Sequence, residues 1–121
     1  MSFAVLLAAA SLTVPIGTSW LFRVERGQPV AARQVGATHV PARGEIRVTA
    51  RRMLGTTLTA LNNSATAFTF RATLIAADGK ALTARSCVLP ANNRLAMESW
   101  PQAAIAVRVG DFHPTTAANC R

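Results

Sequence analysis

From Met1 to Phe22 the chain carries no ionisable side chain, and most of its residues there are apolar. The 13 Lys and Arg residues and the 5 Asp and Glu residues all lie beyond this segment. A helix of about 20 residues is about 30 Å long, which matches the hydrocarbon core of a bilayer. We therefore predict that residues 1–22 form a helix that acts as a transmembrane anchor or as an uncleaved signal.

The end of this segment has the residue order of a membrane interface. Trp20 and Phe22 are aromatic, and Arg23 is the first charged residue after them. Aromatic rings gather at the level of the lipid head groups, and charged side chains follow on the water side. Trp20, Phe22 and Arg23 are accordingly predicted as membrane-interface anchors.

Two other interpretations of residues 1–22 stay open. A cleaved secretory signal starts with basic residues and ends at a small-residue cleavage site; here no basic residue precedes Phe3, and residues 17–19 form only a weak site. The other interpretation is an apolar helix buried inside a soluble domain.

Residues 23–44 are interrupted by glycine and proline and show no sustained period of 2 or 3.6 residues. Such residues break both helices and strands. We predict an extended linker arm over residues 23–44, either a tether or a segment that orders on a partner, in which the single His39 is solvated.

Residues 45–112 alternate between apolar and polar side chains, as half-buried strands do. The alternation is clearest over residues 68–74, and it is also regular over residues 45–52. Asp78-Gly79 and residues 90–93 have the composition of turns between such strands. Six or so short strands separated by turns predict an antiparallel sandwich or a small barrel.

The strand rhythm resembles that of immunoglobulin-like sandwiches, although the chain lacks their Cys-Trp-Cys spacing. We predict a mainly β protein in which residues 45–121 form a small antiparallel immunoglobulin-like β-sandwich, with residues 112–121 as its C-terminal tail. The side chains expected in its core are Leu58, Phe68, Phe70, Leu74, Val88, Trp100, Ile105 and Val107.

The chain has 2 cysteines, Cys87 in a predicted strand and Cys120 next to the last residue. A disulfide between them would pin the tail to the sandwich and close a loop of about 32 residues, worth roughly 3–4 kcal/mol. We predict this disulfide, which implies an oxidising compartment. The domain is therefore expected in the periplasm or outside the cell.

The formal charge of +8 comes mainly from arginine, since Lys80 is the sole lysine. Arg43, Arg47, Arg51 and Arg52 lie close together in the sequence and form a candidate basic interaction face. Such a face can meet anionic lipid head groups or an acidic protein subunit. Nucleic acid is not expected as a partner, because the other arginines are scattered and aromatic residues do not alternate with them.

The residues needed for catalysis are not arranged in any known motif. Ser86, Asp111 and His113 supply the residue types of a triad without its sequence pattern. Cys87, Cys120 and His113 could together bind copper or zinc, but they lack the usual spacing of metal ligands. We therefore predict a protein that is not an enzyme and has no cofactor and no bound metal.

These features together predict a non-catalytic accessory or scaffolding subunit of a larger membrane protein complex. One N-terminal helix would anchor it in the cell membrane, and its basic β-sandwich would bind other subunits outside the cytoplasm. Two alternatives stay open: a signal-cleaved periplasmic binding or adhesion module, whose exposed sheet edge pairs with another chain, and a periplasmic metal-handling protein.

Overall fold

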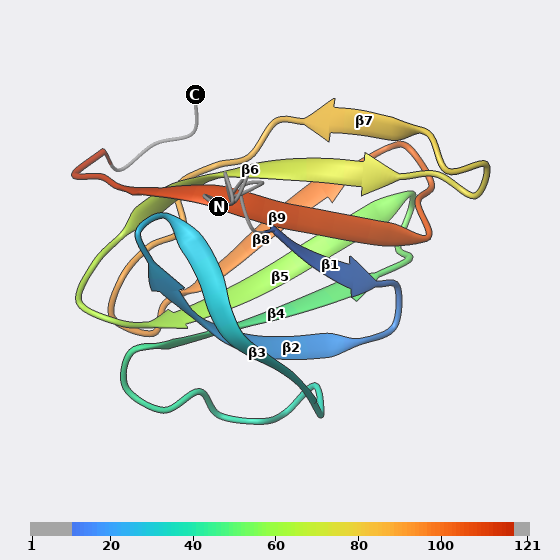
Figure 1. Ribbon diagram of the computed structural model, residues 1–121. Helices are drawn as coiled ribbons and strands as arrows, with labels where there is room; N and C mark the ends of the chain where they lie inside the picture. Colours follow the sequence, from blue (N-terminus) through green and yellow to red (C-terminus); the bar gives the residue numbers. More distant parts are fainter. Residues whose placement is uncertain (1–10, 118–121) are drawn as a thin grey trace, which may run out of the picture.

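The computed structural model describes residues 11–117, which form two antiparallel sheets in a sandwich-like arrangement (Figure 1). The described strands are β1 (Ser11–Pro15), β2 (Ser19–Glu25), β3 (Gln28–Val35), β4 (Glu45–Arg51), β5 (Thr56–Asn63), β6 (Phe68–Ile75), β7 (Ala81–Ala84), β8 (Leu95–Trp100) and β9 (Ala106–Pro114). The prediction of a mainly β, antiparallel, sandwich-like fold is confirmed.

The strand order is β1-β9-β6-β7 in the four-stranded sheet, called sheet A, and β3-β2-β4-β5-β8 in the five-stranded sheet, called sheet B. In Figure 1 sheet A lies above sheet B, with β9 in red and β6 in yellow-green over β2, β4 and β5. The first and last described strands are neighbours, since β1 pairs with β9.

The core between the sheets is centred on the ring of Phe112 in β9. The Phe22 ring lies 5.4 Å from it, the Phe70 ring stacks at 5.6 Å, and the Phe68 ring meets it edge-on at 6.0 Å. Tilted and edge-on aromatic pairs add to the stability that burial provides. Phe112, which the sequence placed in a tail, is therefore a central core residue.

The predicted N-terminal helix is wrong for residues 11–22, which form β1, a turn and the first part of β2. Residues 1–10 lie outside the described residues. Over residues 11–117 the structure has no helix that is long and apolar enough to cross a membrane.

The burial pattern explains why this segment looks like a membrane span. In β1, Leu12 and Val14 are buried between exposed neighbours, as in any half-buried strand. In β2, both Leu21 and Phe22 are buried although they point to opposite faces of the sheet. A strand that is covered on both faces is apolar at successive positions, and its average hydropathy resembles that of a helix in a membrane.

The predicted linker arm is also wrong over residues 28–35, because β3 pairs with β2 in a hairpin. Its turn is Arg26-Gly27, with φ values of 52° and 79°. Two successive residues of positive φ are what a two-residue hairpin turn requires. The turn lies against β9, since the carbonyl of Gly27 accepts a hydrogen bond from the amide of Phe112 at 2.8 Å.

The rest of the predicted arm, residues 36–44, folds back against sheet B and is called the flap. Pro41 is fully buried. Two side chains of sheet B donate hydrogen bonds to flap carbonyls, Asn63 Nδ2 to Pro41 at 2.9 Å and Arg47 Nη1 to His39 at 2.7 Å. Residues 23–44 are therefore part of the sandwich.

Most of the expected core side chains are buried. Confirmed core residues are Leu58, Phe68, Leu74, Trp100 and Val107, and Phe70 packs against them. Ile105 is wrong, since it precedes β9 and is 47% exposed. Val88 is half-buried.

Candidate interaction surface

The face of sheet B that points away from the core carries the predicted basic residues of β4. Ile46, Val48 and Ala50 lie in the core, so Arg47 and Arg51 lie on the opposite, outer face. Arg51 is exposed. Arg47 is half-buried, and its side chain donates a hydrogen bond to the flap.

The structure does not place all four predicted arginines on that face. Arg43 is exposed in the flap, and its carbonyl accepts a hydrogen bond from Arg23 Nη1 at 3.3 Å. Arg52 donates from Nη2 to the carbonyl of Ala104 at 3.1 Å, which directs its side chain toward the loop before β9. The outer face of sheet B thus keeps Arg47 and Arg51, with Arg43 beside them in the flap.

Glu45 is the buried carboxylate of this face. Its Oε1 accepts a hydrogen bond from the amide of Ala42 at 2.8 Å, and its Oε2 lies 3.2 Å from Arg33 Nη1. The bond from Ala42 and the nearby Arg33 charge hold the pKa of Glu45 below its ordinary value, although burial opposes them. These contacts attach the flap to sheet B. They also occupy the Glu45 carboxylate, which therefore does not neutralise the charges of Arg43 and Arg51.

Next to these arginines, sheet B exposes apolar side chains. Leu95 and Met97 on the outer face of β8 are each 61% exposed. Met53 is 55% exposed and Leu54 fully exposed on the turn between β4 and β5. We call Met53, Leu54, Leu95 and Met97 the apolar strip.

Glu98 and Trp100 of β8 point inward and hold the segment of residues 85–89. Trp100 Nε1 donates to the carbonyl of Arg85 at 2.7 Å, and Glu98 Oε1 accepts a hydrogen bond from the amide of Cys87. Burial raises the pKa of the Glu98 carboxyl above its ordinary value, and the Cys87 amide opposes that rise. One face of β8 therefore closes the sandwich, while the other is exposed.

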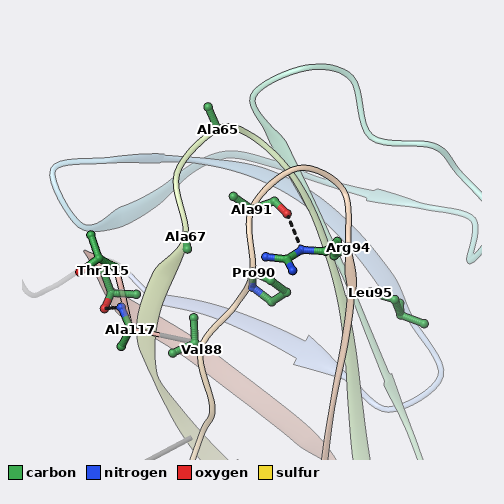
Figure 2. A pocket seen from close by; sticks show the side chains of 10 residues that line it. Ala65, Ala67, Val88, Pro90, Ala91, Arg94, Leu95, Thr115 and Ala117 are labelled. Atoms are coloured by element: carbon green, nitrogen blue, oxygen red, sulfur yellow. Dashed lines mark hydrogen bonds between the residues drawn. The ribbon is translucent and has the colours of Figure 1, made fainter. Parts of the chain in front are cut away.

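A cavity of about 520 Å³ lies at the start of β8 (Figure 2). Arg94 points into it beside Pro90 and Ala91, with its Nε 3.5 Å from the carbonyl of Ala91. Most of its remaining lining is small and apolar: Ala65, Ala67, Val88, Leu95, Thr115, Thr116 and Ala117. The cavity therefore combines apolar side chains, two threonine hydroxyls and one cationic side chain.

The three predicted membrane-interface anchors have different positions in the sandwich. Phe22 is a core residue, and Trp20 packs against the core with its Nε1 donating to Thr18 Oγ1 at 3.1 Å. Arg23 is exposed on β2. The interface role is not supported for Phe22, because its ring is enclosed by protein.

The candidate triad residues do not bond to one another as a triad. Ser86 Oγ donates to the carbonyl of Phe70 at 2.5 Å, whereas His113 Nε2 lies 2.9 Å from Asp111 Oδ1 on the exposed face of β9. Within residues 11–117 no group of three or more His, Cys, Asp or Glu side chains is arranged to hold a metal ion. Cys120 lies outside the described residues, so the disulfide and the metal site that use it stay predictions.

The sequence interpretation missed the apolar strip, Arg94 and the cavity. The alternation over residues 45–112 predicted strands, but alternation alone does not tell which face of an edge strand such as β8 is covered. Comparisons with protein-family models, with curated protein sequences and with solved structures gave no match. The candidate surface is therefore defined by its geometry and charge.

Proposed function

We propose that this chain is a non-catalytic accessory subunit that binds an acidic partner protein through the outer face of sheet B. The observation that carries the proposal is the apolar strip, which lies beside Arg51 on a sandwich whose other large apolar side chains are mostly buried. The partner would be another subunit of a membrane protein complex.

The apolar strip supports binding because exposed apolar side chains gain free energy when a partner covers them. Methionine is well suited to such a surface, since its unbranched side chain adapts to the shape of a partner. Met53 and Met97 both belong to the strip. Interfaces commonly combine such an apolar centre with a polar rim.

The charge of the surface supports an acidic partner. Arg51 is exposed beside the strip and Arg43 is exposed in the flap, while Glu45 is engaged with Arg33 and the flap. The whole chain carries a formal charge of +8, so two copies repel each other. An acidic protein surface therefore complements this face better than a second copy does.

The location at the cell membrane, with the sandwich in the periplasm or outside, is kept as part of the proposal. The placement outside the cytoplasm rests on the predicted Cys87–Cys120 disulfide and its oxidising compartment, and the location at the membrane rests on the proposed partner. A helical span over residues 1–22 no longer supports it, because residues 11–22 form strands. Cleavage near Ser19 would remove β1, which is paired with β9.

A charge-reversal experiment tests the proposal. The tagged chain is extracted from membranes of its own cells in mild detergent, and the proteins that stay bound are identified. The variant Arg43→Glu/Arg51→Glu is compared with Arg85→Glu/Arg108→Glu, which changes the net charge equally but alters Arg108 on the outer face of sheet A. All variants are checked for unchanged thermal unfolding.

The expected result is a stoichiometric partner with an acidic surface that the first variant loses and the second retains. A chain that comes out alone and monomeric contradicts the accessory-subunit proposal. Binding to vesicles of anionic lipid, lost in the first variant and kept in the second, would assign the face to lipid head groups and contradict a protein partner.

A further inference from the structure

Over residues 11–117 the sandwich has four edge strands: β1 and β7 in sheet A, and β3 and β8 in sheet B. An edge strand presents backbone N–H and C=O groups that no neighbouring strand uses. Proteins usually protect such edges with proline, with charged residues, with bulges or by keeping the strand short. The four edges can therefore be compared by these features.

Three of the edges are protected. β1 has 5 residues and ends at Pro15, and β7 has only 4 residues. β3 begins with Gln28-Pro29 and contains Ala31 at a φ of 53°, next to a shift of its register with β2. Each of these features hinders the addition of another strand.

β8 lacks these protections. It has 6 residues without proline, and its register with β5 runs from Leu95 to Trp100 without a shift. Its one charged residue, Glu98, points inward and is bonded to the Cys87 amide. Among the described strands only β5 pairs with β8. The unprotected edge is also the edge that carries Leu95 and Met97 of the apolar strip.

We propose that β8 accepts an extended acidic segment of the partner as a sixth strand of sheet B. This inference rests on the proposed function, because it names the part of the partner that binds. Backbone hydrogen bonds along β8 supply affinity, and side chains on alternate positions of the added strand supply specificity. Apolar side chains of that strand cover Leu95 and Met97 on the outer face.

The acidic character of the segment follows from the charges around β8. Arg94 precedes the strand and Arg51 lies on the outer face of the same sheet, whereas the carboxylate of Glu98 is turned inward. A second copy of this chain would bring a second Arg94 and a second net charge of +8 to the same edge. Charge complementarity therefore favours an acidic chain over self-pairing.

The cavity at the start of β8 adds a further element of recognition. Leu95 and Arg94 belong both to its lining and to the first part of the edge (Figure 2). An apolar side chain at the end of the added segment fits against Val88 and Pro90, and a neighbouring carboxylate pairs with Arg94. The preferred segment thus combines acidic and apolar residues.

Synthetic peptides of about eight residues, the length of a strand, test this inference directly. The probe alternates Glu and Val, and its counterpart alternates Lys and Val. Binding to the full chain is measured by fluorescence anisotropy, and hydrogen exchange of the backbone amides locates the peptide. The expected result is binding of the acidic probe only, with slower exchange of amides in β8.

Met97→Glu is the variant that protects the edge, and Leu82→Glu on β7 is its matched control. Both add the same charge at an exposed apolar side chain of an edge strand. Met97→Glu is expected to weaken binding of the acidic probe by at least about tenfold, because it removes an apolar contact and repels the probe, and Leu82→Glu to leave it within about twofold. Arg94→Gln is expected to weaken it while the Lys-Val peptide stays unbound.

Three results would overturn the inference. They are equal binding of both peptides, slower exchange on β1, β3 or β7 in place of β8, and dimerisation that protects β8 without any peptide. The proposed function is tested separately, by the partner recovered from membranes. If Met97→Glu still retains that partner while Arg43→Glu/Arg51→Glu loses it, the proposed function stands and the strand-addition inference is wrong.

Discussion

The ring centroids of Phe22 in β2 and Phe112 in β9 lie 5.4 Å apart, so the two sheets are joined at the centre of the core by one residue from near each end of the described chain. Phe112 also contacts Phe68 and Phe70 of β6. The stability of the sandwich therefore depends strongly on this ring.

Phe112→Ala is expected to lower the free energy of unfolding by about 3–5 kcal/mol, because it removes a fully buried ring and leaves a cavity between the sheets. Urea unfolding followed by circular dichroism measures the change. Phe112→Leu, which retains more of the volume, is expected to lose less. A loss below about 1 kcal/mol for the alanine variant would show that Phe112 is not central to the core.

Removal of β1 is expected to destabilise the sandwich by about 3–6 kcal/mol, because Leu12 and Val14 leave the core. The comparison is between a chain that starts at Thr18 and a matched chain that starts at Ser11. Thermal unfolding measures both. Equal melting temperatures would mean that β1 contributes little to stability. Cleavage near residues 17–19 would then be compatible with a stable sandwich.

Glu45→Gln is expected to lower stability at pH 7 by about 1 kcal/mol, because the neutral side chain bonds less strongly to the Ala42 amide and Arg33. The pKa of Glu45 is lowered by folding from an ordinary value of 4.5. Its ionised form therefore stabilises the fold above that pH, and this contribution is lost as the pH falls through the lowered pKa. Unfolding curves between pH 7 and about pH 3 should show the difference between the two proteins shrinking.

Glu98→Gln is expected to have the opposite effect. Burial raises the pKa of Glu98 above 4.5, so the folded state holds the proton more tightly than the unfolded state. The wild-type protein then loses stability as the pH rises from 4.5 through the raised pKa, and Gln removes that loss while its oxygen still accepts the Cys87 hydrogen bond. Thermal unfolding at pH 7 should show a variant at least as stable as the wild type; a clearly lower melting temperature contradicts this reasoning.

The predicted disulfide has a direct mass-spectrometric test. Intact protein purified without reductant should weigh two hydrogens less than reduced protein, and digestion should yield a Cys87–Cys120 cross-linked peptide. Cys87→Ser and Cys120→Ser should each lower stability by roughly 3–4 kcal/mol, since either opens the same loop. Alkylation of both thiols in the unreduced folded protein would show that the disulfide is absent.

The sequence was sufficient to predict a strand where apolar and polar side chains alternate regularly and one face of the strand is covered. The segment predicted as residues 45–52 is β4, with Ile46, Val48 and Ala50 in the core. The predicted Asp78-Gly79 turn joins β6 to β7, with Gly79 at a φ of 85° and Ile75 paired with Ala81. These elements depend on residues that are close together in the sequence, so the sequence alone is enough to predict them.

The failures came from contacts between distant residues. Ser11, Thr13 and Pro15 alternate with Leu12 and Val14, which is a strand signal, but average hydropathy over a longer window hides it. Leu21 is buried on the outer face of sheet B, beside its register partners Arg33 and Arg47. The aliphatic part of an arginine side chain covers apolar neighbours. Both arginines are far from Leu21 in the sequence. The exposure of Leu95 and Met97 likewise depends on which strand occupies the edge.

The position of β9 between β1 and β6 has a consequence for synthesis of the chain. As the polypeptide leaves the ribosome, β2 to β5 can pair with one another early, because their partners are close in sequence. Sheet A lacks β9, the strand between β1 and β6, until residues 106–114 emerge. The nascent chain is therefore expected to hold an uncovered apolar face until β9 is made, which favours a chaperone or delayed folding.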